Sequence, residues 1–494
     1  MKKPLLFLSA LILSFGLLAK GNLPRTIVTT DGEIDDVDTF IRMLLYANEF
    51  QLEGLIYSSS MWHYKGDGKG TSFVSEMEMT KKMYGPRTSL RWPGVTWIED
   101  LLDQYAKVYP NLMLHSQTYP SPDYLRSLVK VGNIDFEGEM EKVTAGSEWI
   151  KQKLMDESDN EEIYLQAWGG TNTIARALKS IEEENSNKPN WPAIQSRISK
   201  KAIIYTILDQ DATYKKYIGV HWPQIRIFYN AIQFACMAYP WKRDVPKSIQ
   251  PYFEGAFMGP LINNHGPLLK KYYAYGDGQH QEGDEEHDHG DLSKHKPLGL
   301  FKPYDFISEG DSPAFLNLMD TGLDNYQNPT YGGWGGRFIK SKENPYRFED
   351  GDQVADLNPE TGKLDKNYPQ TRWLEAIQLD FLARAEWCVK PYNQANHAPW
   401  ITVREGTKLW AQAGEKLTLH VSAQDKDNNQ VLFKAWPYVE AGDGKATVLL
   451  EGSMVRVQLP VTAKKGDKYH VIVEGTDNGT PKLTRYRRVV IQIL

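Results

Sequence analysis

The sequence predicts an α/β domain with a mainly parallel open sheet and helices on both of its faces, followed by a smaller all-β sandwich. Two observations lead to this prediction. Short β-branched strands alternate with amphipathic helices through residues 25–392, and residues 401–494 carry only strand-like alternation. At 494 residues the chain is too long for one ordinary domain, and its 41% hydrophobic content is that of a globular protein.

The first residues indicate export. Lys2 and Lys3 precede an apolar run over residues 4–18, and Ala19 offers a small residue for cleavage. This is the order of a secretory signal peptide, so we expect residues 1–19 to be removed and the protein to be secreted or periplasmic. The alternative is an uncleaved anchor. No later apolar stretch approaches the length of about 20 residues that a membrane span needs.

Composition narrows the class of partner. The formal net charge of −6 argues against binding a nucleic-acid polymer through bulk charge. Aromatic residues make up 12% of the chain, which favours either the recognition of sugar rings or large aromatic core residues. Only Cys236 and Cys388 are present, so at most one disulfide can form. The sequence leaves the oligomeric state open.

The α/β region is recognised from its buried strands. Segments 25–29, 52–58, 163–167 and 202–207 are short, apolar and rich in β-branched residues. Helices follow the first and the third strand, because apolar residues recur there at the spacing of one buried helical face. These residues are Val37, Phe40, Ile41, Leu44 and Leu45 in the first helix and Ile174, Ala177, Leu178 and Ile181 in the second. Parallel sheets place their sites at the carboxyl ends of strands, so the residues after each strand are the first candidates for chemistry.

Residues 393–400 form the predicted linker. Beyond them, apolar side chains alternate in runs separated by turn clusters, which is the pattern of a sandwich of about 100 residues. The runs are Leu417, Leu419 and Val421; Val455, Val457 and Leu459; Tyr469, Val471 and Val473; and Val489, Ile491 and Ile493. Segment 474–484 is similar to the late strand and turn of cadherin-like or immunoglobulin-like bacterial modules.

The first strand-to-helix junction is unusually acidic. It carries five carboxylates within eight residues, among them Asp31, Asp35 and Asp36. Capping of the following helix accounts for one or two of them, at about 0.3–1 kcal/mol each. A hard divalent cation accounts for the rest, because Ca²⁺ prefers six to eight oxygen ligands. An EF-hand loop does not fit the positions of glycine and glutamate, and a haloacid-dehalogenase phosphatase would need a nucleophilic aspartate where Thr29 stands.

Asp31-Gly-Glu-Ile-Asp35-Asp36, after a strand and before an apolar helix, resembles the aspartate-rich signature of the calcium-dependent nucleoside hydrolases. The resemblance implies that Asp31 is both a calcium ligand and the base for the attacking water. It also implies that Asp35 holds sugar hydroxyls and that Asp36 binds calcium. The chain departs from the family where Thr29 replaces a further aspartate and Gly32-Glu33 replaces Pro-Gly.

Three later segments resemble the same family. In Trp168-Gly-Gly-Thr-Asn172 the residue before the glycines supplies a calcium-binding carbonyl, here Trp168, and Asn172 is an expected substrate contact. Glu309-Gly310-Asp311 resembles the segment that supplies another calcium carboxylate, here Asp311, with Gly310 where the hydrolases carry a histidine that helps the nucleobase leave.

The third segment, Ile207-Leu-Asp209-Gln-Asp211, follows the strand whose loop supplies sugar-binding groups in the family. Asp209 and Asp211 are therefore expected substrate contacts. Together with Tyr331-Gly-Gly-Trp334-Gly-Gly-Arg337 and the terminal sandwich, these motifs resemble a secreted nucleoside hydrolase-like family that includes a bacterial cellulose-binding protein.

Several candidates have an ordinary structural alternative. Trp62 and His63 are expected to contact a sugar or replace the missing acid, or else they pack a loop. Trp334 and Arg337 are bracketed by four glycines, which favours a site loop over a plain turn because glycine lets a ligand approach the backbone.

For two acidic clusters, a structural role is favoured over metal binding. His280, His287 and His289 stand in a loop rich in Asp and Glu over residues 275–297, where solvation is favoured over zinc binding. In the sandwich, Asp425, Asp427 and Asp477 are expected to cap turns rather than to bind a second calcium.

These inferences lead to two hypotheses. The first is a secreted, calcium-dependent hydrolase of N-glycosidic, nucleoside-like or related glycosidic bonds, with a calcium-bound water as nucleophile. The second is a carbohydrate-binding protein that holds cellulose or another polysaccharide with little or no catalysis. The expected partner in either case is a sugar-containing molecule.

Overall fold

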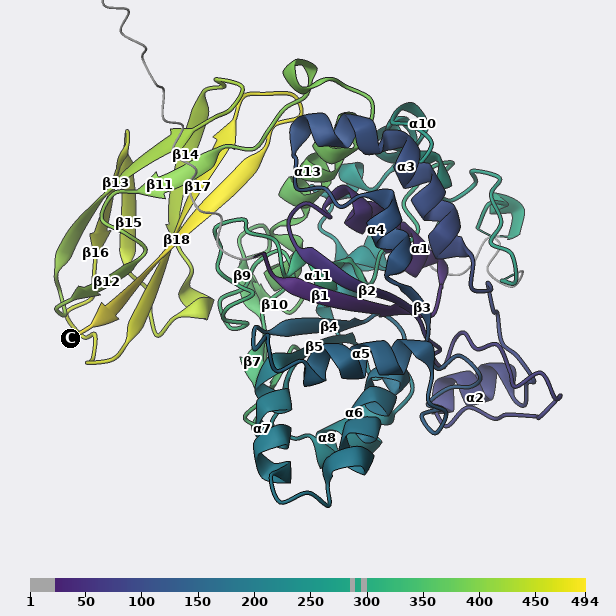
Figure 1. Ribbon diagram of the computed structural model, residues 1–494. Helices are drawn as coiled ribbons and strands as arrows, with labels where there is room; N and C mark the ends of the chain where they lie inside the picture. The colour runs from purple at the N-terminus through teal and green to yellow at the C-terminus, as the bar shows by residue number, and fades with distance from the viewer. Residues whose placement is uncertain (1–22, 285–288, 295–299) are drawn as a thin grey trace, which may run out of the picture.

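The computed structural model describes residues 23–284, 289–294 and 300–494 (Figure 1). Its largest sheet has the strand order β3-β2-β1-β4-β5-β6-β8-β7, and all neighbouring strands are parallel except the pair β7–β8. The strands are β1 (Arg25–Thr30), β2 (Gln51–Tyr57), β3 (Val129–Val131), β4 (Ile163–Ala167), β5 (Ala202–Ile207), β6 (Arg226–Asn230), β7 (Ile339–Lys340) and β8 (Arg347–Glu349). The predicted fold class is confirmed.

Helices cover both faces of this sheet. They are α1 (Ile34–Leu45), α2 (Glu78–Tyr84), α3 (Trp97–His115), α4 (Pro122–Ser127), α5 (Ala145–Met155), α6 (Asn172–Asn185), α7 (Trp191–Lys201), α8 (Gly219–His221), α9 (Trp241–Asp244), α10 (Gly255–Asn264), α11 (Ser312–Leu316), α12 (Tyr368–Thr371) and α13 (Leu374–Trp387). Adjacent residues of β1 face opposite sides, so Ile27 packs in the core under α5, α6 and α7 while Val28 packs in the core under α1, α3 and α13. Figure 1 shows these two helical layers on either side of the sheet.

The connections reverse direction at β1. Strands β2 and β3 extend the sheet on one side of β1, and β4, β5 and β6 extend it on the other. Such a switch point opens a crevice at the carboxyl ends of the two central strands. Gly32 makes the turn there with φ of 81°, and a Cβ atom at this position would lie 2.7 Å from both Pro93 Cγ and Trp97 Nε1. A side chain at position 32 would therefore collide with the wall of the crevice.

The C-terminal part is a sandwich of two four-stranded sheets, ordered β11-β13-β16-β15 and β12-β18-β17-β14. Its strands are β11 (Trp400–Val403), β12 (Lys408–Ala411), β13 (Lys416–Gln424), β14 (Val431–Pro437), β15 (Thr447–Glu451), β16 (Met454–Gln458), β17 (Lys468–Asp477) and β18 (Thr484–Ile493). A hairpin of β9 (Asp356–Asn358) and β10 (Lys363–Asp365) precedes α12. Each predicted run of alternating apolar residues begins inside one of these strands.

The two parts share apolar core. Tyr438, Ile472 and Tyr486 of the sandwich belong to the same buried cluster as the residues of α1 and α13. Arg488 of β18 is buried and donates hydrogen bonds to the carbonyl oxygens of Leu323, at 2.7 Å, and Gly332, at 2.9 Å. The sandwich is therefore docked onto the α/β domain by both apolar packing and buried hydrogen bonds.

Two sequence expectations are settled at the level of the fold. Cys236 and Cys388 are both free and buried, so they form no disulfide. Over the described part of the chain, no helix combines the length and apolar character that crossing a membrane requires. The predicted signal peptide, residues 1–19, lies outside the described residues.

Candidate functional site

A cavity of about 440 Å³ opens at the carboxyl ends of β1, β4 and β5. Carboxylates from the first strand-to-helix junction and from the start of α11 line one part of it, and apolar side chains line the rest. The lining residues outside the acidic group include Trp62, Met79, Met83, Tyr84, Arg91, Trp168, Phe234, Tyr239 and His289. The site thus lies where the topology of the sheet predicts one.

Three carboxylates converge in this cavity. One oxygen from each of Asp35, Asp36 and Asp311 lies within 4.8 Å of the others. Asp36 accepts a hydrogen bond from Thr30 Oγ1, and Asp35 Oδ2 accepts one from Ser308 Oγ at 3.2 Å. Asp36 and Asp311, both expected to bind calcium, are therefore neighbours although 275 positions separate them in the sequence numbering. Asp35, expected to hold the sugar, belongs to the same group.

The carboxylates of this group repel one another. Burial raises the pKa of Asp36 well above its ordinary value, and the charges of Asp31, Asp311 and Asp35 raise it further. Burial followed by the charges of Asp35 and Asp31 does the same to the pKa of Asp311. Buried carboxylates that repel one another are stabilised by a cation, so the electrostatics of the cavity fit a positively charged ligand.

The oxygen atoms also fit a hard cation. Among the described residues, neither oxygen of Asp31 nor Oδ1 of Asp35 has a hydrogen-bond partner, although all three atoms are buried. Buried polar atoms are normally satisfied, and carboxylate oxygens are the ligands that Ca²⁺ prefers. The acidic cluster could therefore hold a metal ion, with Asp31 at its border.

Asp31 sits against β4 and a histidine. A Cβ atom on Gly169 would lie 2.7 Å from Asp31 Cγ, so the end of β4 packs directly on this carboxylate. His63 Nδ1 lies 3.6 Å from Asp31 Oδ2. Burial raises the pKa of Asp31, but His63, together with Ser60 and Asp36, outweighs it and holds that pKa below its ordinary value. Its surroundings thus favour the charged form of Asp31, whereas the pKa values of Asp35, Asp36 and Asp311 are raised.

His63 is held between two carboxylates. Its Nε2 lies 3.5 Å from Asp284 Oδ2, and Asp284 in turn pairs with Arg91, whose Nε is 2.8 Å from Asp284 Oδ1. Burial and the charge of Arg91 lower the pKa of His63, but Asp284 and Asp31 outweigh them and raise it to about 9. The side chain expected to contact sugar therefore lies behind Asp31 as a buried imidazolium.

Arg91 and Asp284 were not singled out from the sequence, because they come from two loops far apart in the chain. Asp284 belongs to the segment expected to be a solvated acidic loop, yet it is buried here, and His289 of the same segment lines the cavity and stacks on Tyr239. His287 lies outside the described residues. This loop is therefore only partly solvated, since Asp284 and His289 are buried whereas His280 and Glu282 are exposed.

One wall of the cavity is apolar. Trp62, expected from the sequence, contributes to it together with Phe234 and Tyr239. Met79 and Met83 of α2 also line it and are 54% and 59% exposed. Their four-residue spacing on one helical face is a sequence signal for such a wall, although it is weak without the position of the helix. A ring can pack here beside the carboxylates.

Trp168 contributes to the cavity in two ways. Its side chain is part of the lining, while its carbonyl oxygen accepts a hydrogen bond from Gln210 Nε2 at 2.6 Å. A carbonyl oxygen has two lone pairs, so this bond leaves capacity for a further interaction. Gln210, which was not singled out, therefore orients the carbonyl that is expected to reach calcium.

Three expected substrate contacts are engaged in local structure. Asn172 is fully buried and donates to Ser59 Oγ at 2.9 Å, and Asp211 Oδ2 accepts from the backbone of Asn172 at 2.9 Å. The carboxylate of Asp209 accepts from the backbone of Tyr214 and Lys215. None of the three is among the residues that line the cavity.

The glycine-rich loop lies at the domain interface. Arg337 pairs with Asp356, with Nε 2.9 Å from Oδ1, and Tyr438 of the sandwich donates to the same carboxylate at 2.6 Å. Trp334 is fully buried beside Arg485 of β18. Neither Trp334 nor Arg337 lines the carboxylate cavity. Of the four glycines, Gly332 lies against Tyr438 of the sandwich, and the other three lie against Asn325, Asn317 and Gln233 of the α/β domain.

Position 310 has no room for an acid. A Cβ atom on Gly310 would lie 2.9 Å from Asp35 Oδ2 and 3.3 Å from both Ala238 Cβ and Phe234 Cδ2. Phe234 and Ala238 thus fill the space that a side chain would use.

In the sandwich, Asp425 Oδ1 accepts from two backbone N–H groups of its own turn, as turn capping requires.

The sequence model described as the nucleoside hydrolase-like domain of cellulose-binding Sde182 matches residues 25–338. The chain belongs to the Sde182 nucleoside hydrolase-like family. The model described as the C-terminal domain of cellulose-binding protein Sde0182 matches residues 416–493 of the same chain. Membership of the predicted family is confirmed, and the Sde182 description associates it with carbohydrate.

Solved structures agree with this assignment to the Sde182 family. A nucleoside hydrolase-related hypothetical protein from Saccharophagus degradans, described as associated with carbohydrate metabolism, is 25% identical, and the match covers 96% of this chain and 100% of that one with a TM-score of 0.70. The effector protein XOO4466 matches at 11% identity over 75% of this chain and 95% of its own, and its TM-score of 0.36 carries no argument. No curated protein matches the chain.

Proposed function

We propose that the protein is an exported, calcium-dependent hydrolase of N-glycosidic or related glycosidic bonds. The observation that carries the proposal is the convergence of Asp35, Asp36 and Asp311 in this cavity. Asp31 is buried beside them, close enough for its charge to raise the pKa of each. Asp36 and Asp311, the Asp31 carboxylate and the Trp168 carbonyl are the groups that would hold calcium. Bound calcium would supply the lowered water pKa and the orientation of sugar hydroxyls on which such hydrolysis depends.

The residues of the chain have separate parts in the reaction. Asp31 accepts the proton of the attacking water, because its neighbour His63 favours the ionised carboxylate. Asp35 Oδ1 is available to accept a hydrogen bond from a sugar hydroxyl. Trp62, Phe234 and Tyr239 form the wall against which a ring packs and from which water is excluded.

The leaving group must depart without an acid at position 310. Because Gly310 offers no proton and its surroundings are filled, the substrate carries a group that leaves readily or the acid comes from another part of the cavity. This same observation favours the second function, in which the protein binds cellulose or a related polysaccharide with little or no hydrolysis. The cellulose-binding description of the Sde182 family supports it independently.

Calcium titration and sugar release separate the two functions. We expect calorimetry to detect one calcium site that Asp36→Asn weakens strongly, and we expect release of reducing sugar from a panel of nucleosides and aryl glycosides to stop in chelator. Asp209→Asn is the matched control, since Asp209 is an aspartate after a neighbouring strand that does not line the cavity. Calcium binding without sugar release leaves the binding function, and calcium binding unchanged in Asp36→Asn rejects the metal site.

A further inference from the structure

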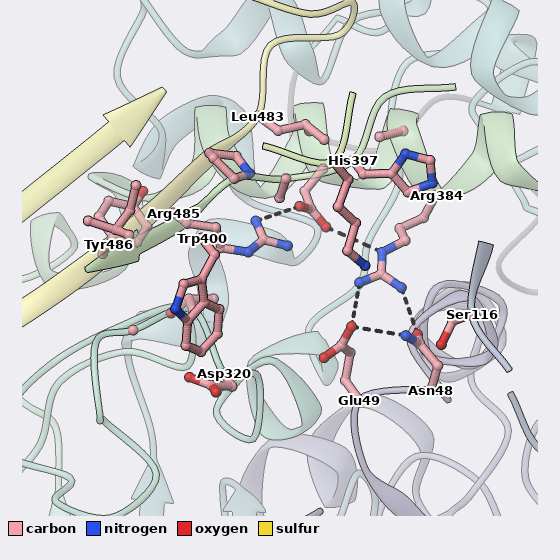
Figure 2. A pocket seen from close by; sticks show the side chains of 18 of the residues that line it. Asn48, Glu49, Ser116, Asp320, Arg384, His397, Trp400, Leu483, Arg485 and Tyr486 are labelled. Atoms are coloured by element: carbon pink, nitrogen blue, oxygen red, sulfur yellow. Dashed lines mark hydrogen bonds and ion pairs between the residues drawn. The ribbon is translucent and has the colours of Figure 1, made fainter. Parts of the chain in front are cut away.

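A second cavity, of about 600 Å³, lies between the α/β domain and the sandwich (Figure 2). It shares no lining residue with the carboxylate cavity. Leu23 and Pro24, which precede β1, and Asn48 and Glu49, which precede β2, place it at the amino-terminal edge of the sheet. Its volume is that of a small-molecule site, which typically occupies about 300–1,000 Å³.

The floor of this cavity is a fixed polar network. Arg384 donates to Asn48 Oδ1 at 2.6 Å and to Glu49 Oε1 at 2.7 Å. Asp380 links the two domains, because its Oδ2 accepts from Arg485 of β18 at 2.7 Å and its Oδ1 lies 3.8 Å from Arg384 Nε. These planar groups are preorganised by one another, so their remaining hydrogen-bonding capacity is held in place for a ligand.

The charges that line the cavity balance. Four acidic and four basic side chains contribute to it, namely Glu49, Asp320, Asp380 and Asp425 against Arg384, Lys426, Arg485 and Arg487. A phosphate or an acidic sugar would find no excess of positive charge here, and a metal ion would find each buried carboxylate already beside a guanidinium group. The chemistry that fits is a neutral ligand rich in hydroxyl groups, which can both donate to carboxylates and accept from arginines.

An indole side chain completes the site. Trp400, the first residue of β11, is 49% exposed and lines the cavity. Arg487 lies over its ring, with Cζ 4.7 Å from the ring centroid. Figure 2 shows the indole on one side of the cavity and the group of Glu49, Asn48 and Arg384 on the other. An aromatic face opposite planar polar groups can hold the apolar face and the hydroxyl edge of a sugar ring together.

We propose that this interdomain cavity binds a neutral glucan segment, with Trp400 as its stacking platform and Arg384 and Glu49 as its hydrogen-bonding floor. The site is independent of the carboxylate cavity and requires both domains. It gives the cellulose-binding character of the Sde182 family a location on this chain, whether or not the other cavity hydrolyses a glycosidic bond.

Binding of the full-length protein to swollen insoluble cellulose and to cellohexaose tests the proposal. We expect Trp400→Ala to weaken both by about tenfold or more, because it removes the aromatic platform. Trp400→Phe should restore most of the affinity. Trp410→Ala is the matched control, since Trp410 lies on β12, is 62% exposed and does not line the cavity. Thermal unfolding of each variant shows whether it is folded.

Asp311→Asn separates this proposal from the hydrolase. It is expected to weaken calcium binding strongly and to keep wild-type affinity for both glucans. Wild-type affinity in Trp400→Ala overturns the proposal, and so does loss of glucan binding in Asp311→Asn alone. A wild-type protein that binds neither glucan overturns it as well.

Discussion

The carboxylate cavity and the interdomain cavity differ in whether their acidic side chains are paired with basic ones. The cavity at the carboxyl ends of the strands is lined by four acidic side chains, Glu33, Asp35, Asp36 and Asp311, against one basic side chain, Arg91. The cavity at the opposite edge of the sheet is lined by four of each sign. In the first, carboxylates face one another, and in the second, each buried carboxylate of the floor faces a guanidinium group.

This difference indicates what each cavity can accept. Unpaired buried carboxylates are costly unless a ligand brings positive charge, so the first cavity is completed by a cation. Paired carboxylates need no further charge, so the second is completed by hydroxyl groups. The same residue types therefore predict different ligands, because the neighbours of each carboxylate decide which ligand it needs.

Removing the buried carboxylate of the interdomain cavity has the largest expected effect on the stability of the protein. Asp380→Ala leaves Arg384 and Arg485 without their shared carboxylate, and breaking such a buried pair typically costs about 3–5 kcal/mol. Urea denaturation should show this as a lower midpoint. Asp320→Ala, which removes an exposed acid from the same cavity, should change the midpoint little. Equal losses in the two variants would contradict the importance of the buried pair.

In the carboxylate cavity, removal of one charge should not destabilise the calcium-free protein, in contrast to Asp380→Ala. Asp311→Asn is expected to weaken calcium binding by about 100-fold, or about 2.7 kcal/mol. In chelator the same variant should be at least as stable as the wild-type protein, since it relieves the repulsion that raises the pKa of Asp36. Calorimetry and thermal unfolding with and without calcium measure the two effects. A variant that is less stable in chelator would contradict the account of the repulsion.

A smaller effect is expected on acidification, again at the domain junction. His115 lies 3.0 Å from His397, which pairs with Asp427, and Arg384 is nearby. Burial lowers the pKa of His115 to about 4, below its ordinary value near 6.5. Between these values the unfolded chain binds a proton that the folded protein does not, so stability falls as pH drops from about 6.5 to about 4, by up to about 1.4 kcal/mol per pH unit from this group.

Denaturation midpoints across this pH range measure that loss. His115→Gln should flatten the profile, because the amide keeps a donor and an acceptor but does not titrate. A profile that keeps its slope in His115→Gln assigns the titration to another group.

The smallest expected effect concerns Gly310. Its added Cβ in Gly310→Ala meets the carboxylate of Asp35, the end of a side chain, at 2.9 Å, and the side chains of Ala238 and Phe234 at 3.3 Å. A stability loss under about 1 kcal/mol is expected because these groups can shift slightly. The displaced Asp35 should weaken sugar binding several-fold with calcium affinity nearly unchanged. Equal losses of calcium and sugar affinity would place Asp35 among the metal ligands.

Four strands of the large sheet, β1, β2, β4 and β5, were predictable because periodicity is a local property. The predicted segments 163–167 and 202–207 coincide with β4 and β5, and the first helix is α1. The convergence of Asp36 and Asp311 was predictable only through resemblance to a family, since their separation in sequence gives no physical signal of contact. Strands β14 and β15 were not predicted, although each carries an alternating pattern of burial.

The remaining differences come from partners that sequence cannot identify. The glycines around Trp334 do permit a close approach, but the approaching groups are Asn325 and Asn317 of the α/β domain, with Tyr438 of the sandwich against Gly332. His63 was expected to contact a sugar, to replace the missing acid or to pack a loop, and it lies in a buried charge network with Arg91 and Asp284. Both placements arise where two distant segments meet, because a local pattern defines only one side of such a contact.

The apolar interface between the two domains, which includes Tyr438, Ile472 and Tyr486 and is called the seam below, has an evolutionary consequence. Neither domain can be recombined with an unrelated domain unless that domain presents the same apolar surface. Drift on one side of the seam selects compensating changes on the other, so descendants of this gene should inherit or discard the pair as a single unit.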